Sequence, residues 1–589
     1  MKLRLSAVLL MLNVAAFCQP SNITQGRHPK ISPDLTWDEM NTSVPIIVQY
    51  AEQADPHSIA QRGLRRGHAP RVMTGVRMMS LHADRALAED MASDSSVEYI
   101  TPDRTVQGSA SGLIPPPSVF TPLGYTATTL PLTQMVAGSP YSVNVPYTAP
   151  PAQTGNGIGV AVIDSGILDD FPFKDTTCGK SRIVYSENFV AGSTAATDLY
   201  GHGTHVAALL AGASTCTTAV GYFNGIAPKV NLINLRVLDA NGSGTDSQTI
   251  SAIDRAIALK STYNIRVINL SLGRVIRESF TKDPLTLAVQ RAWQAGILVV
   301  VAAGNNGRDN SMATSGYSTI TSPGNSPYVL TVGAARAENG AANMLSGVRT
   351  QFTVSSYSSK GPTLIDQVVK PDLLAPGNRM LQWLPANMPL AQKYPGNIVN
   401  FMNYPLFLMS GTSAATPVVS GAAALLLEKD PTLTPDQVKA RLMQTAWKGM
   451  ATTASIVLSD INTTVTENQD IFAIGTGLLD VNAALASTTN ITTTQSALSP
   501  RVVKQSTQVV LTNSYTGISS SGVVWGSGVV WGSGVVWGSS DVSSTGVVWG
   551  SGVVWGSSTV SGSGVVWGSG VVWGSASPFS ESLAINGDR

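Results

Sequence analysis

The 589-residue sequence predicts an α/β fold, in which helices cover both faces of a mostly parallel, twisted sheet, preceded by a small α+β module. Between residues 157 and 487, short runs of apolar, β-branched residues alternate with helical stretches. Such runs are typical of parallel strands that are buried on both faces. A second strand-and-helix pattern, at residues 45–106, is separated from the first by a stretch rich in Pro, Gly, Ser and Thr, which indicates two folded parts.

The small module contains strands expected at residues 44–50, 71–79 and 97–100, the last continuing toward Asp103 and Val106, and a helix at 82–91. Residues 107–152 are expected to form a linker or an extended arm. From the residues alone, an independent binding domain is the alternative interpretation of this module.

The larger domain is expected to use strands at 159–163, 230–237, 267–272, 297–302 and 328–332, with helices at 247–260 and 285–294 between them. Small residues from Ser413 onward predict a buried helix of about four turns that starts at Ser413, with Pro417 near its first turn. Thr434 and Gln437 form a capping-box pattern that opens a last helix, with Pro435 at its first position. Residues 475–482 are expected to close the domain.

The composition excludes several kinds of partner. The net charge is +1, so neither nucleic acid nor an anionic membrane surface is indicated. A basic start and a predominantly apolar segment of twelve residues at 6–17 are typical of a secretory signal that is cleaved before Gln19. No other apolar run reaches the ~18 residues of a membrane span. We therefore expect an exported protein, secreted or extracellular, with cell-surface association left open.

Three cysteines are too few for a disulfide scaffold or a Cys-rich zinc site. Removal of a signal that includes Cys18 leaves Cys178 and Cys216. An even pair in an oxidising compartment predicts a disulfide, and two separate buried thiols are the alternative.

Beyond residue 488 the composition shifts, and Gly-Val-Val-Trp-Gly then occurs seven times, with tryptophans six or twelve residues apart. Regular repeats of this kind are typical of stacked copies of one unit, although the high Gly and Ser content equally favours disorder.

Three residues have the chemistry of a nucleophile, its base and an orienting carboxylate. Asp164 ends a strand, whereas His202 and Ser413 each start a helix, and these positions meet at one edge of an open α/β sheet. Beyond residue 82 the only histidines are His202 and His205, so the base of a site in the larger domain must be one of these two.

Three segments resemble the signature segments of the subtilisin-like serine proteases and follow that family's order, Asp, His, Ser. They are Val162-Ile163-Asp164-Ser165-Gly166, His202-Gly203-Thr204-His205-Val206-Ala207 and Gly411-Thr412-Ser413-Ala414-Ala415-Thr416-Pro417. The resemblance, which covers residues 155–487, implies that Asp164 orients His202, that His202 takes the proton of Ser413, and that Ser413 attacks the peptide carbonyl. It assigns His205 to structure, and it makes Asn305, in Ala303-Gly304-Asn305-Asn306, the side-chain donor to the oxyanion.

The resemblance also implies that substrate binds as an added strand between two backbone segments. The matching residues are Ser271, Leu272 and Gly273, then Gly242, Ser243 and Gly244, with Ala302, Ala303 and Gly304 as one wall of the specificity pocket. Small residues and the lack of an acidic cluster favour large apolar or aromatic substrate side chains. The pocket floor near Thr321 aligns poorly, because residues 308–320 look inserted.

A small module after a signal peptide resembles this family's inhibitory prodomain, which implies a self-processed zymogen whose partners are protein or peptide substrates and its own prodomain. No cofactor is implied for catalysis. Residues 213–220, where the family often binds calcium, contain no carboxylate or asparagine. A structural calcium ion therefore has no assigned site, and a link between Cys178 and Cys216 could replace it.

The predicted divisions are a signal peptide (1–18), prodomain (45–106), linker or arm (107–152), peptidase domain (153–487), linker (488–520), repeats (521–575) and tail (576–589). The predicted function is a secreted serine endopeptidase acting through an acyl-enzyme. The alternative is a surface- or matrix-binding protein whose tail does the main work and whose protease domain is inactive or only processes itself. Hydrolysis of casein, with and without a serine-directed inhibitor, distinguishes the two.

Overall fold

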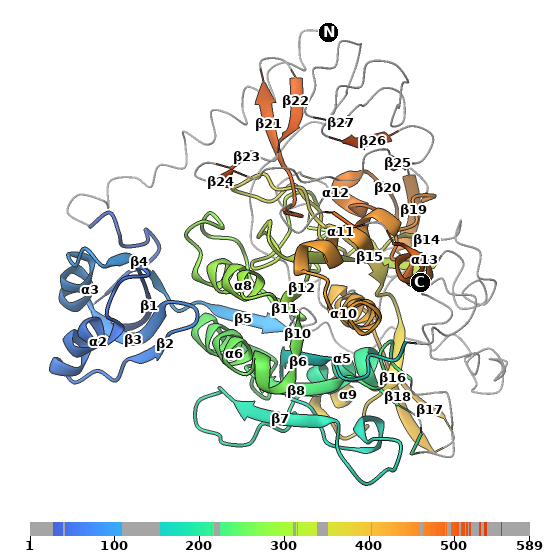
Figure 1. The fold of residues 1–589 in the computed structure, drawn as a ribbon, viewed down its shortest axis with the longest axis horizontal. Coiled ribbons are helices and arrows are strands. Elements are labelled where there is room, and N and C mark those ends of the chain that lie inside the picture. The colour runs from blue at the N-terminus through green and yellow to red at the C-terminus, as the bar shows by residue number, and fades with distance from the viewer. Residues whose placement is uncertain are drawn as a thin grey trace.

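The structure, a computed structural model, describes an N-terminal unit (residues 28–108) and a main unit (residues 153–505), with a few short strands as far as residue 556 (Figure 1). The predicted signal peptide, the linker from residue 109 and most of the tryptophan repeats lie outside the described residues. Gaps within the two units fall at residues 39–41, 214, 217–223, 310–313, 315, 338–351, 402, 451–452, 459–462, 489 and 492–495.

The N-terminal unit is a four-stranded sheet in the order β2-β3-β1-β4 with two helices. Its elements are β1 (Ser43–Tyr50), α2 (Pro56–Arg65), β2 (Arg71–Met73), β3 (Met78–Asp84), α3 (Arg85–Ala92) and β4 (Val97–Pro102). The helices and the sheet share one apolar core, which includes Ile46, Leu87 and Ile100.

The N-terminal unit differs from its prediction in three places. The expected strand at 71–79 is two strands, because a turn at Arg77, with φ of 53°, separates them. The helix expected at 82–91 starts only after Asp84, whose carboxylate accepts the Leu87 amide as an N-cap. Ile31 and Leu35 are buried in the same core, so the unit begins before residue 45.

The main unit is built on an eight-stranded sheet in the order β14-β13-β12-β10-β6-β8-β7, with β15 beside β13. Among the described residues, all of its strand pairings are parallel except β13 with β14, which confirms the predicted fold class. The strands are β6 (Gly159–Asp164), β7 (Ile183–Asn188), β8 (Asn231–Arg236), β10 (Ile265–Leu270), β12 (Leu298–Ala302), β13 (Leu330–Ala337), β14 (Phe352–Val354) and β15 (Leu373–Pro376).

Helices cover both faces of this sheet. Successive side chains of each strand point to opposite sides, so each strand contributes to two apolar cores, one on each face. In β6, Val160 and Val162 pack in the core with helices α5 (His202–Ala211) and α10 (Thr412–Lys429). Ala161 and Ile163 pack in the other core, with α6 (Asp246–Ala258) and α8 (Pro284–Gln294). Figure 1 shows α6 and α8 on one side of β10 and β12, and α10 on the other.

Between β15 and α10, the chain forms a three-stranded sheet that was not predicted. Its strands are β16 (Met380–Trp383), β17 (Ile398–Phe401) and β18 (Tyr404–Met409). A short helix, α9 (Pro389–Lys393), connects β16 to β17. The sheet and its connection pack against α5: the carbonyl of Phe407 in β18 lies 2.9 Å from Nε2 of His205, and a Cβ atom at Gly201 would lie 3.1 Å from the Cβ of Met388, the N-cap of α9.

The predicted end of the domain at residue 487 is too early. After α11 (Pro435–Thr445) and α13 (Val481–Ala486), residues 496–502 return to the main unit. Leu498 and Ser499 are buried, and the amide of Val369 donates to the carbonyl of Pro500 at 2.8 Å. The start of the predicted linker is therefore part of the folded domain.

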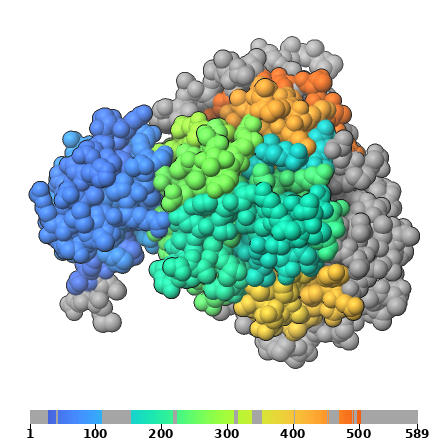
Figure 2. Space-filling view, turned by 60° about the horizontal axis from the view of Figure 1, so that its bottom comes forward, coloured from blue at the N-terminus to red at the C-terminus, as the bar shows by residue number. Residues whose placement is uncertain are grey.

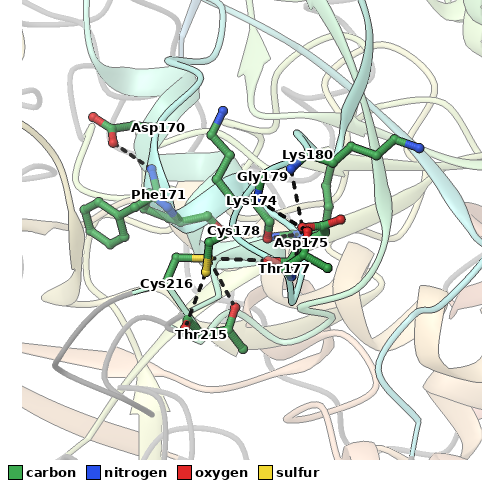
Figure 3. Close-up of a disulfide and its surroundings, with 12 residues drawn as sticks. Asp170, Phe171, Lys174, Asp175, Thr177, Cys178, Gly179, Lys180, Thr215 and Cys216 are labelled. Atoms are coloured by element: carbon green, nitrogen blue, oxygen red, sulfur yellow. Dashed lines mark hydrogen bonds between the residues drawn. A yellow bond between two sulfur atoms is a disulfide. The ribbon is translucent and has the colours of Figure 1, made fainter.

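A disulfide joins Cys178 and Cys216, whose Cα atoms are 5.4 Å apart (Figure 3). Cys178 lies in the turn after the 3-10 helix η1 (Phe171–Phe173), and the Asp175 carboxylate organises this turn by accepting the amide and hydroxyl of Thr177. Cys216 follows α5, so the link ties this turn to the chain beyond that helix. None of the helices in the described ranges is both long and apolar enough to cross a bilayer.

Candidate active site

Asp164 and His202 form a fully buried pair at the carboxyl end of β6. The Nδ1 atom of His202 lies 2.7 Å from Oδ1 of Asp164, which also accepts the amide of Ser165. Burial lowers the pKa of His202, but the charge of Asp164, the hydrogen bond to it and the charge of Asp198 leave this pKa above its ordinary value. With Nδ1 donating to the carboxylate, Nε2 of the neutral ring is left as a proton acceptor.

Asp198, which sequence reasoning missed, fixes the start of the His202 helix. The N-cap of α5 is Gly201, with φ of 114° and no side chain to cap the helix. Asp198 takes over this role: its carboxylate accepts the amides of Tyr200, Gly201 and Thr204. It also accepts the hydroxyls of Ser165 and Thr204. A carboxylate a few residues before a glycine N-cap was the available signal for this residue.

Ser413 lies at the start of α10, as predicted, but it is the second residue of the helix rather than the first. Its hydroxyl and Nε2 of His202 are both buried, and neither makes a hydrogen bond to another described residue. Catalytic hydrogen bonds are often long in enzymes without substrate, so this arrangement is compatible with a nucleophile and its base. Pro417 lies in the second turn of the helix, not in the first.

Asn305 follows β12, and its side chain is held by the residue before Ser413. Its Oδ1 accepts the Thr412 amide at 2.9 Å and the Thr412 hydroxyl at 3.1 Å, which leaves the buried Nδ2 without a partner among the described residues. A Cβ atom at Gly411 would lie 3.2 Å from this Nδ2 and 3.5 Å from Oγ of Ser413. The unused amide donor of Asn305 and the hydroxyl of Ser413 therefore lie close to the same point beside Gly411.

The predicted substrate segments bind a strand of the chain itself. Strand β5 (Thr105–Gly108) lies between β9 (Ser243–Thr245) and β11 (Leu272–Gly273), antiparallel to both. The amide of Gly108 donates to the carbonyl of Gly242 at 3.1 Å. A Cβ atom at Gly108 would lie 3.5 Å from Nδ1 of His202, so β5 ends beside the base.

Residues of the predicted pocket wall contact Thr321. A Cβ atom at Gly304, where φ is 104°, would lie 2.8 Å from Cγ2 of Thr321, and one at Gly273 would lie 2.6 Å from its hydroxyl. Ala302 is the last residue of β12, and the carbonyl of Ala303 accepts the Thr321 amide. Thr321 therefore lies between the two backbone walls, although its surroundings aligned poorly in sequence.

The hydroxyl of Ser271 does not face the bound strand, and a role of this residue in binding substrate through its backbone stays a prediction. Its side chain is fully buried and donates to the carbonyl of Ser413 at 2.9 Å, so the hydroxyl faces the helix α10 rather than the bound strand. Leu272 and Gly273 are the residues of this segment that pair with β5.

His205 packs away from the other site residues, in agreement with its structural assignment. Its Nε2 lies 2.9 Å from the carbonyl of Phe407 in β18. Burial lowers the pKa of His205 to about 4. The hydrogen bond to Phe407 acts in the opposite direction and raises this pKa, whereas the charge of the nearby His202 lowers it further. His205 is therefore neutral near pH 7 and donates to that carbonyl.

Within the described part of the chain, no three His, Cys, Asp or Glu side chains gather where a metal ion could bind. Most of the loop at 213–220, where the family resemblance suggested calcium, lies outside the described residues.

Comparison with known proteins agrees with this geometry. Residues 155–497 match the model of the subtilase family, Peptidase S8. Serine protease AprX of Bacillus subtilis is 38% identical over 291 residues, which are 49% of this chain and 60% of AprX. Subtilisin DY of Bacillus licheniformis is 33% identical over 330 residues, which are 56% of this chain and 91% of that protein.

A solved structure supports the fold. Fervidolysin from Fervidobacterium pennivorans, a keratinolytic enzyme related to subtilisin, aligns with a TM-score of 0.54 at 20% identity and covers 79% of this chain and 63% of its own. The family model spans more than half of the sequence, and the part of the chain that it matches contains Asp164, His202, Asn305 and Ser413. The chain therefore belongs to the subtilase family of peptidases.

Proposed function

We propose that this protein is a secreted serine endopeptidase that hydrolyses peptide bonds of proteins through Asp164, His202 and Ser413. The observation on which the proposal rests is the buried contact of 2.7 Å between His202 and Asp164, which leaves Nε2 as the proton acceptor. The relatives named serine protease and subtilisin support the same activity.

The reaction follows from the residues at the site. A substrate strand binds between β9 and β11, and Ser413 Oγ attacks its carbonyl carbon while His202 Nε2 takes the hydroxyl proton. The oxygen that becomes negative receives a hydrogen bond from Nδ2 of Asn305. His202 then protonates the leaving amine, and water, activated by the same imidazole, hydrolyses the acyl-enzyme. No cofactor takes part in these steps.

The pocket at Gly273, Gly304 and Thr321 favours large apolar or aromatic side chains. Neither glycine carries a side chain that would project into the pocket, and Thr321 packs directly against both. The buried carboxylates of Asp246 and Asp283 are both occupied by Arg274, at 2.8 Å each. Neither is free to pair with a basic substrate side chain. Cleavage of a peptide library after Phe, Tyr or Leu is the expected result, and a dominant preference for Arg or Lys would contradict this pocket assignment.

The N-terminal unit acts in this proposal as an inhibitory prodomain, because it inserts β5 where substrate would bind. Figure 2 shows the unit as a separate lobe beside the main unit. Asp103, just before β5, accepts the amide of Ser247 at 2.8 Å and its hydroxyl at 2.5 Å, near the start of α6. Arg104 pairs with Glu278 of the main unit at 2.7 Å. These contacts hold the strand in place after cleavage.

The enzyme cuts its own chain after β5, since folding places that peptide beside Ser413 at high effective concentration. Wild-type protein should therefore lose its first hundred or so residues during expression, whereas Ser413→Ala should keep them. Intact masses of both proteins measure this, and Ser413→Ala protein cut at the wild-type position would show that another protease does the work.

Added-back prodomain should inhibit the mature enzyme. Because Ile31 and Leu35 belong to its core, the peptide for this titration should span residues 28–108 rather than 45–108. Hydrolysis of casein that a serine-directed inhibitor abolishes is the basic test of the activity itself.

A further inference from the structure

The nucleophile helix α10 contains a proline at its sixth residue, Pro417. An α-helix normally donates the amide of residue i to the carbonyl of residue i−4, but proline has no N–H. The carbonyl without its helical donor is that of Ser413. The hydroxyl of Ser271, which follows β10, donates to this carbonyl at 2.9 Å.

The Ser271 hydroxyl is itself held by a buried chain of hydrogen bonds. The side-chain amide of Asn269, in β10, donates to the Ser271 hydroxyl at 3.1 Å. The hydroxyl of Ser420, two helical turns beyond Ser413, donates to Oδ1 of Asn269 at 2.8 Å. All four residues are fully buried. Because Ser271 accepts from Asn269, its own hydrogen is directed toward the carbonyl of Ser413.

A second contact ties the same helical turn to the sheet. The amide of Gly304, after β12, donates to the hydroxyl of Thr412 at 3.1 Å. The first turn of α10 is thus anchored to the ends of two strands, at Ser271 and at Gly304. Ser271 immediately precedes Leu272 of β11, which pairs with the bound strand β5. The backbone that binds substrate and the backbone of the nucleophile are therefore joined by one side chain.

We propose that Ser271 is a positioning residue for Ser413: its hydroxyl replaces the amide that Pro417 lacks and sets the nucleophile in place relative to His202, Asn305 and the substrate strand. This inference rests on the proposed peptidase function. The Ser271 side chain faces helix α10, so its hydroxyl acts through the backbone of Ser413 and not by contact with the substrate.

The test is a double-mutant cycle of Ser271→Ala and Pro417→Ala. Ser271→Ala leaves the Ser413 carbonyl unpaired and should lower kcat by about 10- to 100-fold, the cost of a nucleophile displaced by a fraction of an ångström to 1 Å, with KM within about twofold. Pro417→Ala supplies the missing amide and alone should stay within about threefold of wild type. Combined with Ser271→Ala, it should restore most of kcat.

Ser358→Ala is the matched control, because Ser358 is also fully buried and accepts the amide of Ala334 at 3.0 Å. It should lower stability without lowering kcat. Wild-type kcat in Ser271→Ala, or a double variant as slow as Ser271→Ala, would overturn the proposal.

The same cycle measured as thermal unfolding in the Ser413→Ala background separates this inference from the proposed function. Ser271→Ala should lower Tm by about 2–4 °C, and Pro417→Ala should recover that loss. If the Tm change of the double variant equals the sum of the changes of Ser271→Ala and Pro417→Ala, the Pro417→Ala amide does not replace the Ser271 hydroxyl as donor to the Ser413 carbonyl. This conclusion does not depend on which substrate the protein hydrolyses. Recovery of Tm with no peptide hydrolysis by wild type would instead overturn the peptidase function and confirm the hydrogen-bond exchange.

Discussion

Ser499→Ala should destabilise the main unit far more than an ordinary serine substitution. Ser499 lies in the returning segment 496–502, and its hydroxyl donates to Oδ1 of Asp372 at 2.5 Å. It also accepts the ammonium of Lys439 at 2.9 Å, while Lys370 donates to the other oxygen of Asp372 at 2.6 Å. All four side chains are fully buried.

The magnitude follows from the two charged partners. A hydrogen bond to a charged group contributes about 1.5–3 kcal/mol, and a buried charge that loses a partner adds a desolvation penalty. Because Lys439 keeps two backbone carbonyls and Asp372 keeps Lys370, the loss should be about 3 kcal/mol in the free energy of unfolding rather than the full cost of an isolated charge. For a domain of this size, that corresponds to a fall in Tm on the order of 5 °C.

The assay is calorimetric unfolding of Ser499→Ala in the Ser413→Ala background, which prevents self-digestion. Ser496→Ala is the control, since this hydroxyl from the same segment makes a longer bond of 3.2 Å to Asp436 and is only partly buried. The control should change Tm by about 2 °C or less. A Ser499→Ala protein that melts within 1 °C of its parent would refute the assignment of this cluster as a stabilising anchor.

Further outcomes follow from the same structure. Asn305→Leu should lower kcat by about 10²–10³-fold with little change in KM, a loss already measured for the corresponding donor of a subtilisin; unchanged kcat would remove Asn305 from the oxyanion site. A protein that ends at residue 505 should hydrolyse peptides like the full chain, whereas one that ends at 490 should melt lower because Asp372 and Lys439 lose Ser499; equal Tm values would count against the corrected boundary. The pKa of His205 is about 4 in the folded protein and about 6.5 in the unfolded chain. The contribution of neutral His205 to the free energy of unfolding should therefore be fully present above pH 6.5 and decrease as the pH falls toward 4. Unfolding profiles of wild type and His205→Gln measure this, and parallel profiles would contradict it.

The class of the fold could be predicted from the sequence, and so could the places of the candidate site residues at the ends of strands and the starts of helices. Strands such as β6 and β12 are buried on both faces, so their runs of apolar residues are unmistakable. Asp164, His202 and Ser413 stand in short segments with a recognisable order. The helix start at Thr434 follows from a local capping signal, which the structure shows as a capping box.

The missed features depend on contacts between distant parts of the chain. Strand β7 is an edge strand whose residues are half-exposed, so it lacks a continuous apolar run. Ser499 is a polar residue that is buried because of partners far away in sequence, Asp372 and Lys439, and no local pattern marks such a residue. The role of Ser271 required knowing which carbonyl Pro417 leaves without its helical partner.

The most direct test of the central claim is the intact mass of the protein after treatment with a phosphonylating serine reagent. Wild type should lose its first hundred or so residues and gain one adduct, which peptide mapping places on Ser413. His202→Ala should keep its N-terminal unit and gain no adduct in the same time. Rapid labelling of His202→Ala, or an adduct on a serine other than Ser413, would contradict the assignment of the catalytic residues.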